Sequence, residues 1–181
     1  ITVNEAGNQA PVLDSIGAQS VNENTNINFV VTASDPDLDI PALTAEGLPL
    51  GATFVDNSDG TGTFDFTPGF DQAGDYNISF IASDGALADS EVVTLTVIDV
   101  NRPPVLDSIG SQLVDEGANL NFGVSASDLD GTIPVLTSSI LPPNATFVDN
   151  GDGTGVFDFN PDFTQGGMVY MTFYATDGLA T

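Results

Sequence analysis

The sequence predicts an all-β protein made of two tandem seven-stranded Greek-key β-sandwiches, of which the second lacks its last strand. Three observations predict this fold: an ungapped internal repeat with a period of 93 residues, apolar residues that alternate with polar ones, and turn-forming clusters between the alternating runs. Alternation with a period of two is typical of half-buried strands. About seven short strands in roughly ninety residues fit a sandwich of two sheets.

The repeat defines the domains. The segment NQAPVLDSIGAQ, from Asn8, aligns with NRPPVLDSIGSQ, from Asn101, and 46 of the 81 aligned positions are identical. A repeat of this length indicates separate domains, each with its own core. The predicted domains are residues 8–100 and 101–181. Residues 1–7 are predicted to be the end of the last strand of a preceding repeat, because Ile1, Thr2 and Val3 align with the end of the last strand of the first module.

Within the first module the strands are predicted by alternating apolar residues, and no segment predicts a helix. The alternating sets are Ile27, Phe29 and Val31; Phe64 and Phe66; Tyr76, Ile78, Phe80 and Ala82; and Val93, Leu95 and Val97. Turn clusters occupy the segments Asp35–Pro41, Asn57–Gly60, Thr67–Asp75 and Asp84–Ser90.

The segments VDNSDGTGTF (Val55 to Phe64) and VDNGDGTGVF (Val148 to Phe157) contain closely spaced aspartates. They miss the spacing of a calcium-binding EF-hand loop, and they lie between alternating apolar runs. Asp-Gly in that setting favours a hairpin turn, so we interpret both segments as β-hairpins.

The composition excludes several classes of function. The chain has 26 acidic residues, a single basic residue (Arg102), no His and no Cys, and its net charge is −25. The nucleophile and base pairs of acyl transfer therefore cannot be assembled. Nucleic acids and anionic membrane surfaces would be repelled. The natural counter-charge is a cation, while 41% hydrophobic residues and twelve Phe are enough for a core.

Paired carboxylates can hydrolyse glycosidic bonds, and the chain offers Asp65 with Asp71 and Asp158 with Asp162. Nothing in the sequence places either pair in a cleft, and most of the aromatic residues occupy alternating core positions. We therefore expect that the protein is not an enzyme.

The segment YNISFIASDGALADSEVVTLTVIDVNRPPV, from Tyr76 to Val105, resembles the end of a cadherin-type repeat. It also resembles the putative-immunoglobulin repeats of long bacterial and archaeal surface proteins. The resemblance covers nearly the whole chain. It implies sandwich modules joined end to end in an extracellular or cell-surface protein, with Ca²⁺ held at the junctions.

The resemblance also implies which residues would bind Ca²⁺. At the central junction they are Glu23, Asp99, Asn101, Asp128, Asp130 and Asp177, and the counterparts Asp35, Asp37 and Asp84 face a preceding junction near Asn8. Carboxylate and amide oxygens suit Ca²⁺, but Asp and Asn are equally typical turn formers. The acidic E–F motif of cadherins is absent, with only Asp71 or Asp75 nearby. Arg102 stands where that family has an Asp, so we expect fewer ions per junction.

The function that follows is a structural or adhesive spacer, a segment of a repetitive surface fibre, stalk or adhesin whose junctions are stiffened by calcium. Its partners would be neighbouring repeats of the same array or subunits of the same fibre, with no nucleic acid and no direct membrane insertion. The alternative is a glycan- or protein-binding accessory module of a secreted protein.

The second module stops at Thr181, where its last strand is expected to begin. In the first module this strand is predicted at Glu91 to Ile98. Without it the strand Val169 to Ala175 would expose an edge and the core would have a gap. We expect the missing strand to come from continuing chain or a neighbouring subunit, with Thr181 of one copy within about 20 Å of Ile1 in the next.

Overall fold

The computed structural model describes residues 7–180 and divides the chain into two compact units, with the boundary between Val100 and Asn101. The strand end predicted at residues 1–7 falls, apart from Gly7, outside the described residues. The described secondary structure is all β, and no helix in residues 7–180 is long and apolar enough to cross a membrane.

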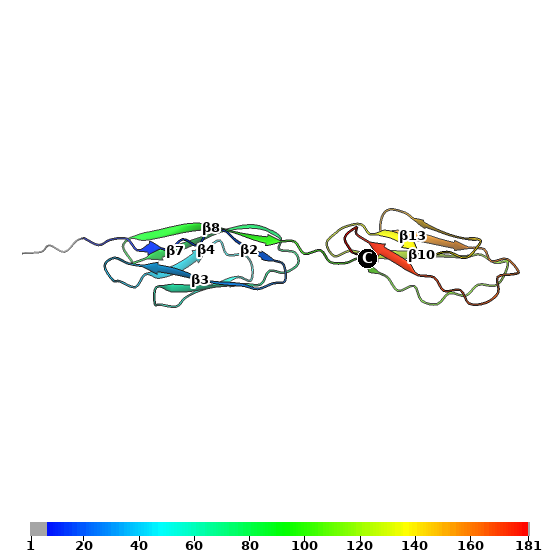
Figure 1. The fold of residues 1–181 in the computed structure, drawn as a ribbon, viewed down its shortest axis with the longest axis horizontal. Coiled ribbons are helices and arrows are strands. Elements are labelled where there is room, and N and C mark those ends of the chain that lie inside the picture. Colours follow the sequence, from blue (N-terminus) through cyan, green and yellow to red (C-terminus); the bar gives the residue numbers. More distant parts are fainter. Residues whose placement is uncertain (1–6, 181) are drawn as a thin grey trace, which may run out of the picture. The chain divides into compact units, whose positions relative to one another are not determined.

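The first module is a sandwich of two four-stranded sheets (Figure 1). One sheet contains, in spatial order, β1 (Val12–Leu13), β3 (Ile27–Ser34), β6 (Thr61–Phe66) and β5 (Thr53–Asp56). The other contains β2 (Gln19–Asn22), β8 (Ala88–Ile98), β7 (Gly74–Ser83) and β4 (Ala42–Glu46). The chain crosses repeatedly between the sheets, which confirms the predicted sandwich.

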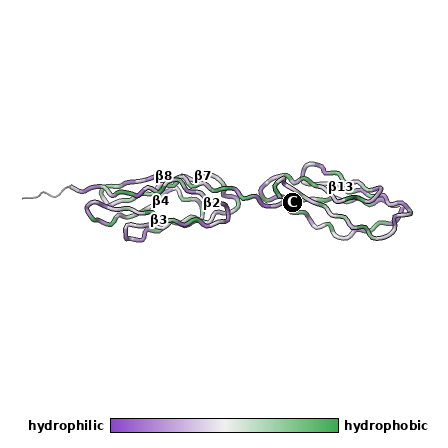
Figure 2. Tube along the Cα trace, viewed as in Figure 1, coloured by the Kyte–Doolittle hydropathy of each residue, from purple (hydrophilic) through white to green (hydrophobic). Residues whose placement is uncertain are grey.

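Alternation along the strands builds the core of the first module. Val93, Leu95 and Val97 of β8 are buried, whereas the residues between them are partly exposed. Figure 2 shows the same alternation of hydrophobic and hydrophilic positions along the chain. Phe64 of β6 is completely buried and meets Phe80 of β7 edge-on, with ring centroids 6.1 Å apart. Aromatic side chains therefore join the two sheets.

Both predicted hairpins are confirmed. β5 pairs with β6 around Asn57–Gly60 in the first module. In the second, β12 (Ala145–Asp149) pairs with β13 (Thr154–Phe159) in the same way. Side chains form the turns, since Asp59 and Asp152 each accept two hydrogen bonds from the Thr two residues later.

The second module has one complete sheet and one reduced sheet. The complete sheet contains β12, β13, β10 (Leu120–Ser127) and β9 (Val105–Leu106). The reduced sheet contains β11 (Val135–Ser138) and β14 (Phe173–Thr176). Among the described residues this module has no counterpart of β2 or β8.

Two strand predictions need correction. The predicted strand Val169 to Ala175 forms only as β14, Phe173–Thr176, whereas its counterpart β7 has ten residues. In the first module β8 lies between β7 and β2 and hydrogen-bonds to both. Residues 7–180 contain no β8 counterpart, so β14 keeps only its ladder with β11 and the segment that matches β2 forms no ladder. β8 itself begins at Ala88, three residues before the predicted start at Glu91, because the β7–β8 ladder continues to Ser83.

Candidate functional site

The first acidic cluster consists of Asn8, Gln9, Asp35, Asp37 and Asp84. The loops that follow β3 and β7 supply its aspartates, and two adjacent residues before β1 tie these loops together. The amide of Asn8 donates to Asp84 Oδ2 at 2.8 Å, and the backbone N–H of Gln9 donates to Asp37 Oδ2 at 2.6 Å. Three predicted site residues of the first module thus lie together.

Asp35 is the buried member of the first acidic cluster, with an exposed fraction of 8%. Its Oδ1 accepts the backbone N–H of Asp37 at 2.7 Å, while its Oδ2 is buried without a hydrogen-bond partner. A buried carboxylate oxygen without a partner is costly unless a positive charge compensates it. This oxygen fits a cation ligand, and the amides of Asn8 and Gln9 carry further oxygens.

The second acidic cluster repeats this arrangement with Asn101, Arg102, Asp128, Asp130 and Asp177. The amide of Asn101 donates to Asp177 Oδ2 at 2.8 Å, and Asp128 Oδ1 accepts the backbone N–H of Asp130. Asp128 Oδ2 is again buried without a partner.

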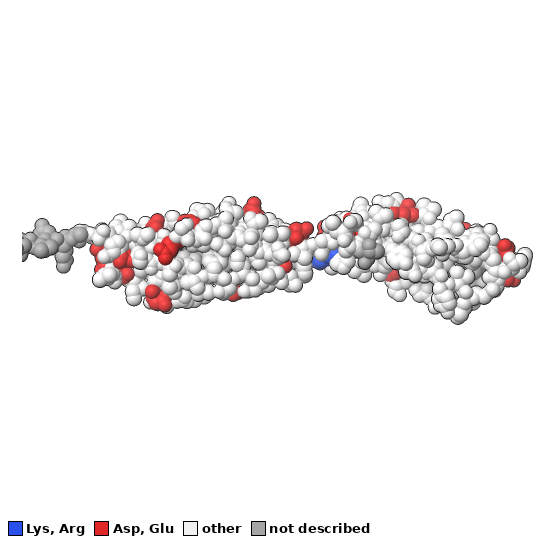
Figure 3. Space-filling model, viewed as in Figure 1, with Lys and Arg blue, Asp and Glu red and all other residues white. Residues whose placement is uncertain are grey.

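Arg102 replaces Gln9 in the second acidic cluster. Its backbone N–H and its guanidinium Nε donate to the two oxygens of Asp130, which lowers the pKa of that carboxyl. Figure 3 shows basic side chains in blue and acidic side chains scattered over the surface of each module in red. A guanidinium already neutralises a carboxylate here, so the second cluster fits a cation less well than the first.

The aspartate that follows β7 or β14 is held ionised by its own turn. The backbone N–H of Leu87 lowers the pKa of Asp84 from its ordinary value of 3.8, as the N–H of Ala180 lowers the pKa of Asp177. Because the pKa of each carboxyl is lowered in the folded state, the two carboxylates stabilise the fold at neutral pH. This stabilisation is lost as the pH falls through the lowered pKa.

Glu23 lies in the first module, with an exposed fraction of 2%. Its Oε1 accepts the backbone N–H of Ala73 and its Oε2 accepts that of Val100, both at 3.1 Å. Glu23 thus fixes the end of the module, with Asp99 exposed beside it. Its counterpart Glu116 is exposed.

Glu23 and Asp99 belong to the first unit, and the other four predicted junction ligands belong to the second. That the two groups meet stays a prediction. Within residues 7–180 no group of three or more Asp or Glu side chains is already arranged to hold a metal ion. In each cluster the carboxylates are instead bridged by amide, backbone or guanidinium N–H donors.

Two acidic residues with structural roles were missed from the sequence. Asp89 accepts the backbone N–H of Leu13, and Glu91 accepts those of Ile16 and Gly17. Both carboxylates stand on β8 and hold the segment that joins the two sheets. Both are partly buried and continue the inward-facing series of Val93, Leu95 and Val97 along β8. Two acids in a series that otherwise faces the core are the sequence signal that could have found them.

Comparison with known proteins shows one family match and several more distant relatives. Residues 8–96 match the bacterial Ig domain family, which is typical of secreted and surface proteins. Integrin beta-like protein E of Dictyostelium discoideum is 32% identical over 135 residues, which cover 66% of this chain and 7% of that protein. Chitinase A of Pseudoalteromonas piscicida is 29% identical over 137 residues, which cover 72% of this chain and 16% of that protein. The chain thus spans less than a fifth of the length of these curated relatives.

Two solved structures are similar over most of the chain. One is the titin domains z1z2 in complex with telethonin, with a TM-score of 0.46, 14% identity, and coverage of 94% of this chain and 95% of that chain. The other is an endo-fucoidan hydrolase of glycoside hydrolase family 107, with a TM-score of 0.45, 20% identity, and coverage of 98% and 28%. The first repeat matches the bacterial Ig domain family, and the second repeats its sequence without a gap, so the chain consists of two Ig-like β-sandwich domains in tandem.

Proposed function

We propose that this chain is a structural or adhesive spacer, a load-bearing segment of a longer extracellular protein. The observation that carries the proposal is the repetition of one module in series, each copy with its own core cluster. Repetition of one module in series suits a part whose task is to span distance. The chain has no imidazole, thiol or Lys amine that could act beside a hydroxyl in a hydrolytic reaction, and enzymatic activity is not proposed.

The carboxylates that could serve as glycosidase acids support this assignment. A general acid needs a raised pKa, whereas hydrogen bonds from Asn121 and Asn119 lower that of Asp158. The hydroxyl of Thr164 likewise lowers the pKa of Asp162. Both carboxylates accept hydrogen bonds from side chains of the second module.

We further propose that a divalent cation, Ca²⁺, stabilises the first acidic cluster through Asp35, Asp37 and Asp84. A bound ion would supply the positive charge that the buried Oδ2 of Asp35 lacks. The central junction of Glu23, Asp99, Asn101, Asp128, Asp130 and Asp177 would bind less calcium, because Arg102 already compensates Asp130. The sequence difference between Gln9 and Arg102 therefore sets how strongly each cluster depends on calcium.

Melting curves test the calcium proposal. We expect a chelator to lower the melting temperature of the wild-type chain, and Asp37→Asn to remove most of the calcium response. Asp71→Asn is the matched control, since it removes one exposed carboxylate outside the clusters. Arg102→Gln should increase the response and Gln9→Arg should decrease it. A wild-type melting temperature that is the same in calcium and in chelator would contradict the proposal.

A second candidate, a glycan- or protein-binding module, is favoured by the tyrosines of the second module. Tyr170 and Tyr174 are exposed where the first module has Asn77 and Ile81. Exposed aromatic rings are common in binding surfaces. Glycan-array binding that persists in chelator and is abolished by Tyr170→Ser would favour this candidate over the spacer.

A further inference from the structure

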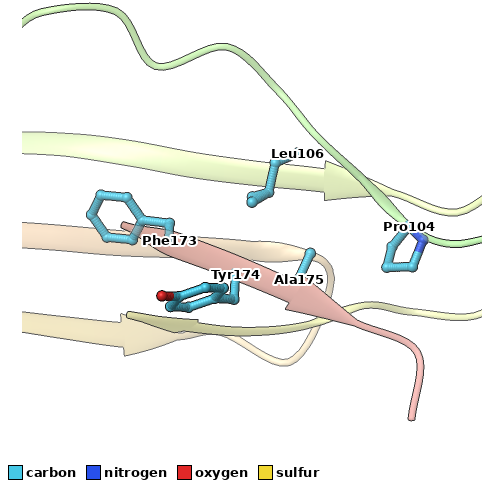
Figure 4. Close-up of a pocket in the computed structure, with 5 residues that line it drawn as sticks. All are labelled: Pro104, Leu106, Phe173, Tyr174 and Ala175. Atoms are coloured by element: carbon cyan, nitrogen blue, oxygen red, sulfur yellow. The ribbon is translucent and has the colours of Figure 1, made fainter. Parts of the chain in front are cut away.

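Exposed apolar side chains have different causes in the two modules. In the second module some of them lie beside β14, where Leu106, Phe173 and Tyr174 line a pocket of the reduced sheet (Figure 4). In the first module both sheets have four strands and the core cluster is covered. An apolar side chain that is exposed in the first module therefore lies outside a complete core.

Leu38 is the most exposed large apolar side chain among the described residues of the first module, with an exposed fraction of 91%. Ile40, two residues later, is 65% exposed. Both belong to the loop between β3 and β4, which also supplies Asp35 and Asp37 to the first acidic cluster. We call Leu38 and Ile40 the apolar tip.

The backbone of Leu38 is strained. Its φ is 69°, in the left-handed region that bulky residues rarely occupy. Leu38 closes a β-turn, because its backbone N–H donates to the carbonyl of Asp35 at 3.1 Å. Glycine is the residue favoured at this last position of a turn, since it adopts a left-handed backbone without a steric penalty. The fold itself therefore does not favour a leucine at position 38.

The second module shows which residue the turn favours. The counterpart of Leu38 is Gly131, which has a φ of 82° and donates its backbone N–H to the carbonyl of Asp128 at 3.3 Å. A Cβ added at Gly131 would meet no atom within 4 Å. The position thus faces open space in both copies of the turn. An exposed and strained residue that the same turn does not need elsewhere points to a role outside folding.

The second module also exposes a leucine in this loop, but in different surroundings. Leu129 is 74% exposed and stands where the first module has Pro36. The guanidinium of Arg102 donates to the backbone carbonyl of Leu129 at 2.7 Å. An exposed leucine with an acid on either side is therefore a feature of the first module.

Charge limits what can cover the apolar tip. Asp37 and Asp39 stand on either side of Leu38, and both are exposed. Residues 8–100 contain no Lys, Arg or His. A second copy of this chain, a nucleic acid or an anionic membrane would bring further negative charge to these carboxylates. A surface that complements the tip carries Lys or Arg around an apolar pocket.

We infer that the apolar tip is a docking point for a partner protein whose surface has an aliphatic pocket rimmed by Lys or Arg. Leu38 enters the pocket, Ile40 covers its edge, and the carboxylate of Asp39 meets the basic rim. The β-turn holds Leu38 in place before binding, so little conformational entropy is lost on docking. Asp39 lies outside the first acidic cluster, so this docking does not depend on calcium. The inference adds a recognition site to the spacer.

Substitutions at Leu38 separate folding from recognition. Leu38→Gly and Leu38→Asn both remove the aliphatic side chain, and both new residues tolerate a left-handed backbone. We expect Leu38→Gly to raise the melting temperature of the first module and Leu38→Asn not to lower it. Leu50→Asn is the matched control, because Leu50 is 88% exposed in the loop at the other end of β4. A lower melting temperature of Leu38→Gly would show that the leucine serves the fold and would overturn the proposal.

The binding probe is a library of ankyrin repeat proteins whose concave surface is randomised, selected on the wild-type chain in chelator. Concave repeat surfaces can form the pocket that the tip requires. We expect the selected clones to be enriched in Lys and Arg, and Leu38→Asn to weaken their binding roughly tenfold to a hundredfold. Asp39→Asn should weaken it by about twofold to fivefold, and Leu50→Asn should leave it unchanged.

Clones that bind Leu38→Asn as tightly as the wild-type chain would overturn the proposal, and so would clones without an excess of Lys and Arg. Two further measurements test other occupants. Self-association in analytical ultracentrifugation that Leu38→Asn abolishes would assign the tip to a second copy of the chain and overturn the basic partner. Binding to phosphatidylcholine vesicles that Leu38→Asn abolishes would assign the tip to a membrane, and would overturn it as well.

Discussion

Replacing Phe64 with alanine is expected to lower the free energy of unfolding of the first module by about 3–5 kcal/mol. Phe64 has no exposed surface and stacks on Phe29 with ring centroids 4.8 Å apart. It also meets Phe66 and Phe80 edge-on. Alanine would leave a cavity between the two sheets that the surrounding rings cannot fill, because they are fixed on separate strands.

Denaturant unfolding monitored at Tyr76, the tyrosine of the first module, measures the effect of Phe64→Ala. Phe163→Ala is the control of the same chemistry, because Phe163 is 81% exposed in the second module. This control is expected to change stability by less than about 0.5 kcal/mol. A cost of Phe64→Ala as small as that of the control would mean that the two sheets do not share the core described above.

Replacing Glu23 with alanine is expected to cost the first module about 1–3 kcal/mol. The substitution leaves the backbone N–H groups of Ala73 and Val100, whose hydrogen bonds to Glu23 are partly buried, without their acceptor. It also releases the end of the module beyond β8, because Val100 is held there by the Glu23 carboxylate. Amide exchange at Ala73 and Val100 should accelerate together with the loss in stability.

Glu116→Ala is the matched control for Glu23→Ala, since Glu116 occupies the same place in the repeat but is exposed. We expect it to change stability by less than about 0.5 kcal/mol. Equal effects of the two substitutions would contradict the role assigned to the buried carboxylate.

The sandwich could be predicted because each strand is marked by a local pattern, the alternation of apolar and polar residues. Alternation at Phe64 and Phe66, or at Val93 and Leu95, reports directly which face of a strand is buried. The division of the first strand into β1 and β2 could not be predicted in this way. It depends on Gly17, whose φ of 69° lets the chain cross from one sheet to the other.

The acidic clusters could be predicted in part. The resemblance to cadherin-type repeats implied that Asp35, Asp37 and Asp84 lie in loops at one end of a module, and the structure brings them together. Burial of one oxygen of Asp35 depends on packing by residues distant in sequence, so no local pattern reveals it. The roles of Asp89 and Glu91 depend on backbone N–H groups about 75 residues away.

The central claim is that the chain bears load as modules in series, and stretching a single molecule between its two ends tests it most directly. We predict two separate unfolding events, each releasing on the order of 300 Å of chain. A single event for the whole chain, or extension without any resolved event, would contradict the account.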